Sequence, residues 1–375
     1  ILKRYIITSF SIDTVFTMVN NLPRQTMFKC LPLLCLIINY STCNEYKLRY
    51  AAVIYRHGDR TPVDTYPTDP WGEESFWPVK FGELTNTGKM QHYKLGQWLR
   101  QRYVNFITDE FDPEAVYVRS TDVDRTLMSA QANLAGMYPP DANSTWNPKL
   151  FWQPIPVHTV PEVNDEILAM KKECKMYEKL KKVYLNSEVY KNRLSYLTKY
   201  TGRKIRDYED ISSIYSTLKI EALYNFTLPN WTHAVFPDKM KSPACYSFTT
   251  ATATPAMTRF MIGPLVKHIL KQALSVILGD SKLRLSMYSG HDFTIGNVLN
   301  GLKKESEYYI QLSYRNSTEI VEPHVLNIPN CGELCPLQHF IQLYEDIITV
   351  DWETECEEKV IYCVYMVLVK GRYSI

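Results

Sequence analysis

Three short apolar runs, each followed by polar residues and then by a helical pattern, constrain this chain more than any other feature. The runs are residues 50–55, 115–118 and 283–288. Their length and composition are typical of buried strands. Strands that alternate with long helices indicate an α/β fold in which helices cover both faces of a central sheet. We therefore predict a mixed, mainly parallel central sheet.

Helical patterns fill much of the intervening sequence. Apolar residues recur at helical spacing on one face, and Thr85 or Thr87 and Ser120 are candidate N-caps. Residues 165–222 are rich in Lys, Glu and Tyr and have helical spacing, which indicates a solvated insertion. We expect a smaller, mostly helical cap region at about 165–280. The predicted helices are 88–106, 121–138, 256–278 and 293–302, and a late strand is predicted at 308–314.

The polar residues after the three runs point to one site. In open α/β sheets, ligands bind beyond the carboxyl ends of the strands. Two of these ends lead into helix N-termini, whose free N–H groups and dipole favour anions. The residues that follow the runs are Arg56-His57-Gly58-Asp59-Arg60-Thr61-Pro62, then Arg119, then Ser289-Gly290-His291-Asp292. We expect these arginines, both histidines and Asp292 to meet at one edge of the sheet.

Three guanidinium groups suit a ligand with several oxygens and more than one negative charge, and a phosphoryl group fits best. His57 can attack phosphorus through Nε2 if another acceptor, such as a backbone carbonyl, holds Nδ1–H. Surrounding cations would lower the pKa of His57 and keep it neutral in acid. Asp292 can protonate the leaving alkoxide while it is itself protonated, which favours low pH.

Other classes of function find little support in the sequence. The formal net charge of +2 gives no electrostatic case for binding nucleic acid. No pair of cysteines or cluster of histidines has zinc spacing, so we expect neither a metal nor another cofactor. No stretch approaches the roughly 20 apolar residues of a membrane helix. The nearest, residues 360–369, lies between charges, and we expect no membrane anchor.

The N-terminal region has the pattern of a secretory signal. Lys29 precedes the apolar run 30–38, so we predict a signal peptide at 27–43. We expect that residues 1–26 are not part of the natural protein and are translated leader sequence. The alternative is a buried N-terminal strand. The first 43 residues carry four basic side chains and one acidic one, so the remainder has a net charge of −1.

Secretion from the cell, or delivery to the lysosomal lumen, agrees with two other features. In an oxidising compartment Cys331 and Cys335 could close a small loop. Four sequons lie beyond the predicted leader, and each is a candidate N-glycosylation site. They begin at Asn143, Asn225, Asn230 and Asn316.

The segment Arg56-His-Gly-x-Arg-x-Pro62, with the later pair His291-Asp292, resembles the histidine acid phosphatases, the acid branch of the phosphoglycerate mutase-like superfamily. The likeness covers about residues 47–356 and is strongest to the prostatic and lysosomal type and to insect venom acid phosphatases. Further matching segments are 116–130, 152–160, Asn225-Phe-Thr-Leu-Pro229 and Cys331-x3-Cys335-Pro-Leu337.

This resemblance implies a role for each site residue. His57 would become the phosphohistidine, and Asp292 would donate a proton to the leaving group. Water would then hydrolyse the intermediate, so the substrate would be a small phosphate monoester. Arg56, Arg60, Arg119 and His291 would bind the phosphoryl oxygens. The resemblance also implies Cys331–Cys335 and Cys174–Cys356 disulfides and allows a homodimer.

The chain departs from its relatives in its C-terminal half. Relatives carry a further segment with another strand between the helix after His-Asp and the late strand, whereas here Leu302 runs directly into Lys303. One cysteine of their third disulfide lies in that segment, and its partner position here is Ile220. The tail 357–375 has no match. These departures bear on sheet completeness, stability and dimerisation.

Two other functions follow from the same residues. One is a secreted protein that binds phosphate monoesters without turnover, which the shortened C-terminal half favours and the intact residue set disfavours. The other is a mutase or isomerase of the same superfamily, which the signal peptide and sequons disfavour. Hydrolysis of p-nitrophenyl phosphate at about pH 5 would separate them.

Overall fold

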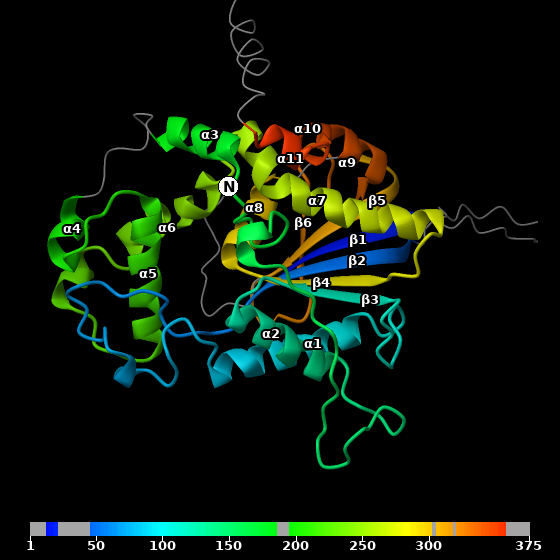
Figure 1. The fold of residues 1–375 in the computed structure, drawn as a ribbon, viewed down its shortest axis with the longest axis horizontal. Helices are drawn as coiled ribbons and strands as arrows, with labels where there is room; N and C mark the ends of the chain where they lie inside the picture. The colour runs from blue at the N-terminus through cyan, green and yellow to red at the C-terminus, as the bar shows by residue number, and fades with distance from the viewer. Residues whose placement is uncertain (1–12, 22–45, 186–194, 302–304, 318–319, 358–375) are drawn as a thin grey trace, which may run out of the picture.

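A seven-stranded mixed sheet forms the centre of the molecule (Figure 1). The computed structural model describes residues 13–21, 46–185, 195–301, 305–317 and 320–357. The strand order is β3-β4-β2-β1-β5-β6, and β7 also pairs with β5. The strands are β1 (Asp13–Asn21), β2 (Tyr46–Arg56), β3 (Val116–Ser120), β4 (Leu285–Gly290), β5 (Glu305–Arg315), β6 (His324–Leu326) and β7 (Cys335–Pro336).

The three strands predicted from the apolar runs are the parallel part of this sheet. Strand β4 pairs in parallel with β2 on one side and with β3 on the other. The remaining pairs that the structure describes are antiparallel. The α/β class and the mixed sheet are therefore confirmed, but among the described strands antiparallel pairs outnumber parallel ones, so the sheet is not mainly parallel. The three carboxyl ends that carry polar residues lie next to one another.

Helices cover both faces of the sheet, as predicted. Along β2, Ala51, Val53 and Tyr55 belong to a core with α1 and α2. The alternate residues of β2 belong to a second core with α7, α8 and α9. Figure 1 shows these two layers on opposite sides of the sheet. Their helices are α1 (Asn86–Arg102), α2 (Asp124–Met137), α7 (Pro255–Leu278), α8 (Asp292–Gly301) and α9 (Leu337–Leu343).

A separate helical cap has its own small core, which includes Tyr66, Ile211, Leu218 and Met240. It lies beside the sheet in Figure 1. The cap helices are α4 (Ser195–Thr201), α5 (Tyr208–Leu223) and α6 (Asp238–Thr250). The expected insertion at 165–280 thus divides into this cap and into α7, which packs on β2 and α8.

The remaining short elements connect these layers. They are α3 (Lys175–Leu185), α10 (Glu345–Ile348), α11 (Trp352–Glu355) and the 3₁₀ turns Glu74–Phe76, Glu162–Asn164 and Asn230–Ala234.

One predicted helix cap is right and the other is wrong. Thr85 caps α1 by accepting a hydrogen bond from the backbone N–H of Gly88. Ser120 does not cap α2, because β3 continues to Ser120, which pairs with Ser289 of β4. Helix α2 begins three residues later than this predicted cap implies, and the preceding residue Val123 makes no side-chain cap.

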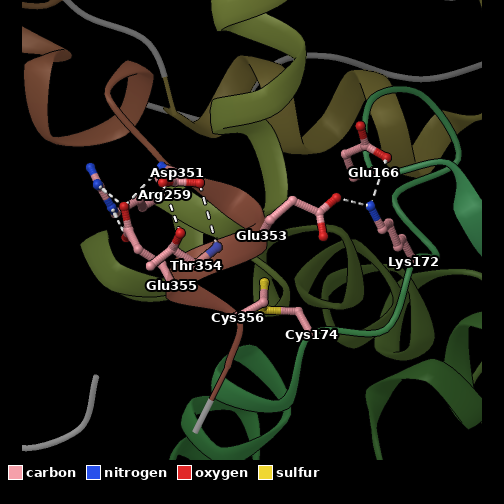
Figure 2. The surroundings of a disulfide bond; sticks show 9 residues. All are labelled: Glu166, Lys172, Cys174, Arg259, Asp351, Glu353, Thr354, Glu355 and Cys356. Atoms are coloured by element: carbon pink, nitrogen blue, oxygen red, sulfur yellow. Dashed lines mark hydrogen bonds and ion pairs between the residues drawn. A yellow bond between two sulfur atoms is a disulfide. The ribbon is translucent and has the colours of Figure 1, made fainter. Parts of the chain in front are cut away.

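Two disulfides close the C-terminal region, and they are the pairs that the resemblance implies. Cys174 lies just before α3 and Cys356 just after α11 (Figure 2). Around this bond, Lys172 contacts Glu353, and Arg259 of α7 donates from Nε to Glu355 at 2.6 Å. Cys331 and Cys335 close the small loop before α9. The chain after α9 is thereby fixed to the sheet-covering layer.

Strand β1 lies within residues 1–26, which we expected not to belong to the natural protein. It runs antiparallel to both β2 and β5, so that Phe16 is paired with Ala52 on one side and with Leu312 on the other. The predicted signal peptide at 27–43 and the tail beyond Glu357 lie outside the described residues. A chain cleaved near residue 43 would lack β1.

Helix α7 is the one helix of the described chain that is long and apolar enough to cross a membrane. Its apolar residues include Met257, Ile262 and Leu265, all buried within the core that covers the sheet. Packing inside the protein accounts for this composition.

Candidate active site

The carboxyl ends of β2, β3 and β4 bring the predicted site residues together. Arg56 is paired with Gly290, and Arg119 with Tyr288. Beyond the paired rows, the backbone N–H of His57 donates to Gly290 O at 3.0 Å, and that of Thr121 donates to Ser289 O at 3.0 Å. The sheet therefore continues into the site and fixes the backbone at all three strand ends.

A hydrogen bond to the backbone holds one of the two ring nitrogens of His57. Its Nδ1 lies 2.8 Å from Gly58 O. A carbonyl only accepts, so Nδ1 carries the proton and donates it there. Nε2 of the neutral ring then keeps its lone pair. This is the arrangement that the sequence predicted for a nucleophilic histidine, with a backbone carbonyl as the acceptor.

Burial and positive charge keep the His57 ring neutral. The residue is 2% exposed. Burial lowers its pKa well below the ordinary value, and the charges of Arg56, Arg60 and Arg125 lower it further. The sequence predicted the direction of this shift from the cations alone, whereas burial is the larger cause.

The loop after His57 and the first turn of α1 each need a glycine where they contact one another. A Cβ atom on Gly58 would lie 2.4 Å from Gly88 O, and one on Gly88 would lie 2.3 Å from Asp59 O. The loop thus packs directly against the first turn of α1. Ser129 of α2 accepts a hydrogen bond from the Gly58 N–H at 3.1 Å.

Asp59 and Thr61 shape the same loop. Thr85, the α1 cap, donates its hydroxyl to the Asp59 carboxylate at 2.6 Å. The Thr61 hydroxyl donates to Lys80 O. Between them Arg60 donates from Nη1 to Thr61 O at 2.9 Å, while burial and the nearby Arg56 lower the pKa of Arg60 to about 9. Arg60 still carries its charge at acidic and neutral pH.

Arg56 is held by groups on two other elements. Its Nε lies 3.2 Å from Oδ2 of Asp292. His92 of α1 donates from Nε2 to Arg56 O at 3.0 Å. Helical spacing in the sequence predicts that His92 lies on a polar helix face and has no role. The structure contradicts the polar face, because the residue is fully buried, and burial lowers its pKa to about 4. Helical spacing could not show that β2 would pack against this face of α1.

Arg119 forms a buried ion pair. Its Nη2 lies 2.7 Å from Oδ1 of Asp165, which is fully buried. The sequence analysis did not single out Asp165. His158 stacks on Tyr117 with ring centroids 5.3 Å apart and is paired with Arg119 in an isolated β-bridge.

His291 lies edge-on to His57, with ring centroids 5.7 Å apart. Its Nε2 is 3.0 Å from the hydroxyl of Thr121, which also contacts the hydroxyl of Thr126. Burial and the charge of Arg125 lower the pKa of His291 to about 3. Burial and neighbouring positive charge therefore favour the neutral form of both site histidines.

Asp292 opens α8 and faces the arginines. Burial by itself would raise the pKa of its carboxyl, but Arg56 and Arg60 outweigh that effect and lower the pKa below the ordinary value. The backbone N–H of Phe293 also donates to Oδ1 at 2.9 Å. Asp292 is thus a carboxylate when no ligand occupies the site.

Arg125 is a fourth arginine of this site that the sequence analysis missed. It lies in the first turn of α2, and its Nη1 is 3.9 Å from where a Cβ on Gly82 would lie. Its charge lowers the pKa of His57, Arg60 and His291. Its buried Nε has no hydrogen-bond partner in the part of the chain that the structure describes. The sequence signal that could have identified Arg125 is its position in the first turn of a helix that follows a strand end.

Three guanidinium groups, those of Arg56, Arg60 and Arg125, act on the neutral imidazole of His57, and Arg119 lies at the adjoining strand end. This arrangement within an α/β fold suits a multiply charged anion. Across the ranges described, no group of three or more His, Cys, Asp and Glu side chains could hold a metal ion.

Comparison with known proteins agrees with this class. The profile of the histidine phosphatase superfamily, branch 2, matches residues 47–258. Prostatic acid phosphatase of Bos taurus is 39% identical over 341 residues, which cover 83% of this chain and 88% of that protein. Lysosomal acid phosphatase of Xenopus laevis is also 39% identical, over 83% of this chain and 79% of that protein. The chain therefore belongs to branch 2 of the histidine phosphatase superfamily, which confirms the predicted family.

Solved structures agree at the level of the fold. The phytase of Citrobacter braakii superposes with a TM-score of 0.54 at 16% identity, covering 82% of this chain and 98% of that one. The phytase of Hafnia alvei gives 0.54 at 17% identity, over 83% and 98% of the two chains.

Proposed function

We propose that this chain is an acid phosphatase that hydrolyses phosphate monoesters through a phosphohistidine on His57. The reaction class follows from the family and from relatives that are themselves acid phosphatases. The observation that carries the mechanism is the hydrogen bond from His57 Nδ1 to Gly58 O at 2.8 Å. It fixes the tautomer and leaves the Nε2 lone pair to attack phosphorus.

The arginines bind the phosphoryl group. Arg56 and Arg119 lie at the carboxyl ends of β2 and β3, which both pair with β4, and Arg60 lies in the loop that follows β2. Arg125 adds a fourth positive charge, and neutral His291 supplies a hydrogen-bonding ring. These groups stabilise the negative charge of the transferring phosphoryl group, which is the main task of a protein in phosphoryl transfer.

Asp292 protonates the leaving alkoxide, and the substrate brings the proton. Asp292 is ionised in the empty site because of Arg56 and Arg60. A phosphate monoester, whose second pKa is about 6, is largely a monoanion at pH 5. Transfer of its proton to Asp292 gives a dianion among the arginines beside a neutral acid. The bound dianion also raises the pKa of Asp292 by repulsion of like charges.

The second half of the reaction uses the same groups in reverse. After the alcohol has left, the Asp292 carboxylate accepts a proton from a water molecule, which attacks the phosphorus and breaks the bond to His57 Nε2. Inorganic phosphate then leaves the arginines, and His57 returns to its neutral form.

Two disulfides fit a protein of an extracellular or lumenal compartment. Within that class we propose a secreted or lysosomal enzyme with sugar chains at the four sequons. Asn143, Asn225 and Asn230 are exposed, as attachment requires, while Asn316 is half-buried. A homodimer remains part of the proposal.

A binder without turnover is the second candidate, and the complete set of site residues speaks against it. The test is the rate of p-nitrophenyl phosphate hydrolysis at pH 5 in the unaltered chain and in His57→Ala. Loss of the nucleophile should lower kcat by about a thousandfold or more. His233→Ala is the matched control, because His233 is exposed and lies in the cap. A hydrolysis rate that His57→Ala leaves unchanged would remove the mechanism, and an inactive unaltered chain would favour the binder.

A further inference from the structure

The partner of Arg119 is the most enclosed carboxylate near the site. Asp165 is fully buried, and its Oδ1 lies 2.7 Å from Arg119 Nη2. Arg119 is 8% exposed. The Nε of the same guanidinium is buried and has no hydrogen-bond partner among the residues described. One edge of the guanidinium is thus held by protein while other donors are left for a ligand.

Backbone groups fix the Asp165 carboxylate in turn. Oδ1 accepts hydrogen bonds from the backbone N–H groups of Ile167 and Leu168, at 3.1 and 3.0 Å. Oδ2 accepts from that of Ala169 at 3.0 Å. With three backbone donors and one guanidinium, the carboxylate cannot turn without leaving buried N–H groups unpaired. Its position therefore determines the position of Arg119.

The same turn also reaches the residues on the other side of the site. Thr294 of α8 donates its hydroxyl to Leu168 O at 3.0 Å. That hydroxyl accepts a hydrogen bond from the backbone N–H of His291 at 3.4 Å. The turn that Asp165 organises thus contacts the start of α8, which carries His291 and Asp292.

The segment that carries this turn is fastened at several points. Lys171 lies 2.8 Å from Glu162 across the turn. Figure 2 shows Lys172 between Glu166 and Glu353 and, close by, the Cys174–Cys356 disulfide. The turn is therefore tied to the C-terminal segment as well as to the site, which makes it a rigid support.

We propose that Asp165 is a positioning residue that holds the Arg119 guanidinium in place to bind the phosphoryl group of the substrate. The proposal rests on the proposed function in assigning phosphoryl binding to Arg119. Arg119 has a flexible side chain, and fixing it beforehand removes the loss of side-chain freedom that ligand binding would otherwise require.

A double-mutant cycle tests this role. Binding of inorganic phosphate is measured by calorimetry for the unaltered chain, Asp165→Asn, Arg119→Ala and the double variant, beside the melting temperature of each. We expect Asp165→Asn to weaken phosphate binding about tenfold, and Arg119→Ala at least as much. In the Arg119→Ala background, Asp165→Asn should have no further effect on phosphate binding, because it acts through Arg119.

Asp141→Asn is the matched control. Asp141 also accepts backbone N–H groups, those of Asn143 and Ser144, but it lies on an exposed loop, and within the described chain its carboxylate makes no hydrogen bond or ion pair with Arg119. It should leave phosphate binding unchanged. A general loosening of the fold by Asp165→Asn would weaken binding equally in both backgrounds, and that result, or no weakening in either, would overturn the proposal.

If Asp165→Asn does not fold, Asp165→Ser replaces it in the double-mutant cycle. A serine hydroxyl can still accept the backbone N–H groups of the turn but offers no charge to Arg119. Phosphate binding is measured directly, so the cycle remains decisive even if His57 proves not to be the nucleophile. Failure of the phosphohistidine mechanism and failure of the Asp165 role are thus separate results.

Discussion

At the scale of single residues, His57 takes its chemistry from its immediate surroundings. Gly58 O holds the Nδ1 proton, and burial together with neighbouring arginines lowers the ring pKa. A histidine with the ordinary pKa of about 6.5 would be protonated, and hence unreactive, at pH 5. The same arginines hold Asp292 in its ionised form until a ligand arrives. One cluster of positive charge thus influences the protonation of both reacting groups, and for His57 burial adds the larger effect.

Arg125 should contribute to phosphoryl binding although no sequence motif assigned it. Arg125→Ala should lower kcat/KM for p-nitrophenyl phosphate by about 10- to 100-fold, since it removes a charged hydrogen-bond donor from the site. Steady-state kinetics measure this effect. Arg284→Ala is the control, because Arg284 is exposed at the amino end of β4, away from the site. Equal kcat/KM values for Arg125→Ala and the unaltered chain would exclude Arg125 from binding.

Asp292→Asn should reveal which substrates need an acid. Alkyl phosphates have basic leaving groups and depend on protonation, whereas p-nitrophenolate leaves readily without it. We expect the substitution to slow alkyl phosphates at least tenfold more than p-nitrophenyl phosphate. The ratio of the two kcat values measures this difference. A ratio unchanged from that of the unaltered chain would contradict the acid role.

Which site residues could be predicted depended on whether local sequence carries the signal. His57, Arg119 and Asp292 directly follow or adjoin apolar runs, so the rule that ligands bind at strand ends located them. Asp165 belongs to no strand end, and its role arises only when the turn packs against β3. His92 was misplaced for a similar reason, because its burial depends on the partner of α1.

At the scale of elements, the apolar runs and helical spacing identified β2, β3, β4 and the helices that follow them. Strand β1 was not predicted as part of the sheet, because a short apolar N-terminal region matches a leader as well as a strand. The sequence predicted the start of a helix wrongly where the preceding strand continues further than its apolar run. Ser120 has the chemistry of a cap, yet pairing with β4 keeps it in β3.

The role of β1 can be tested by shortening the chain to residues 44–375. Without Asp13–Asn21, the facing edges of β2 and β5 lose their backbone partners. We expect a melting temperature lower by several degrees, at about 2–4 °C for each kcal/mol lost. Thermal unfolding followed by circular dichroism measures the change. An unaltered melting temperature would show that the folded sheet does not require β1.

At the scale of the whole molecule, the protonation states favour activity in acid. Burial and the neighbouring arginines lower the pKa of His57, so acid protonates this nucleophile less readily than it protonates an ordinary histidine. The monoanionic substrate, which supplies the proton for Asp292, disappears as pH rises through about 6. The site thus combines a nucleophilic histidine that resists protonation with an acid, Asp292, that receives its proton from the substrate.

The dependence of rate on pH should follow from these two states. For an alkyl phosphate, we expect kcat/KM to be high at pH 5 and to fall about tenfold for each pH unit above about 6. A profile from pH 4 to pH 8 at constant ionic strength measures it. A rate that instead rises between pH 5 and pH 7 would indicate a histidine with the ordinary pKa.

The most direct test of the central claim is a search for the covalent intermediate. The unaltered chain is mixed with a ³²P-labelled monoester at pH 5 and quenched during turnover in alkali, in which phosphohistidine survives. We expect label on the peptide that contains His57 and none on the same peptide from His57→Ala. Turnover of substrate with no label on that peptide would contradict the account.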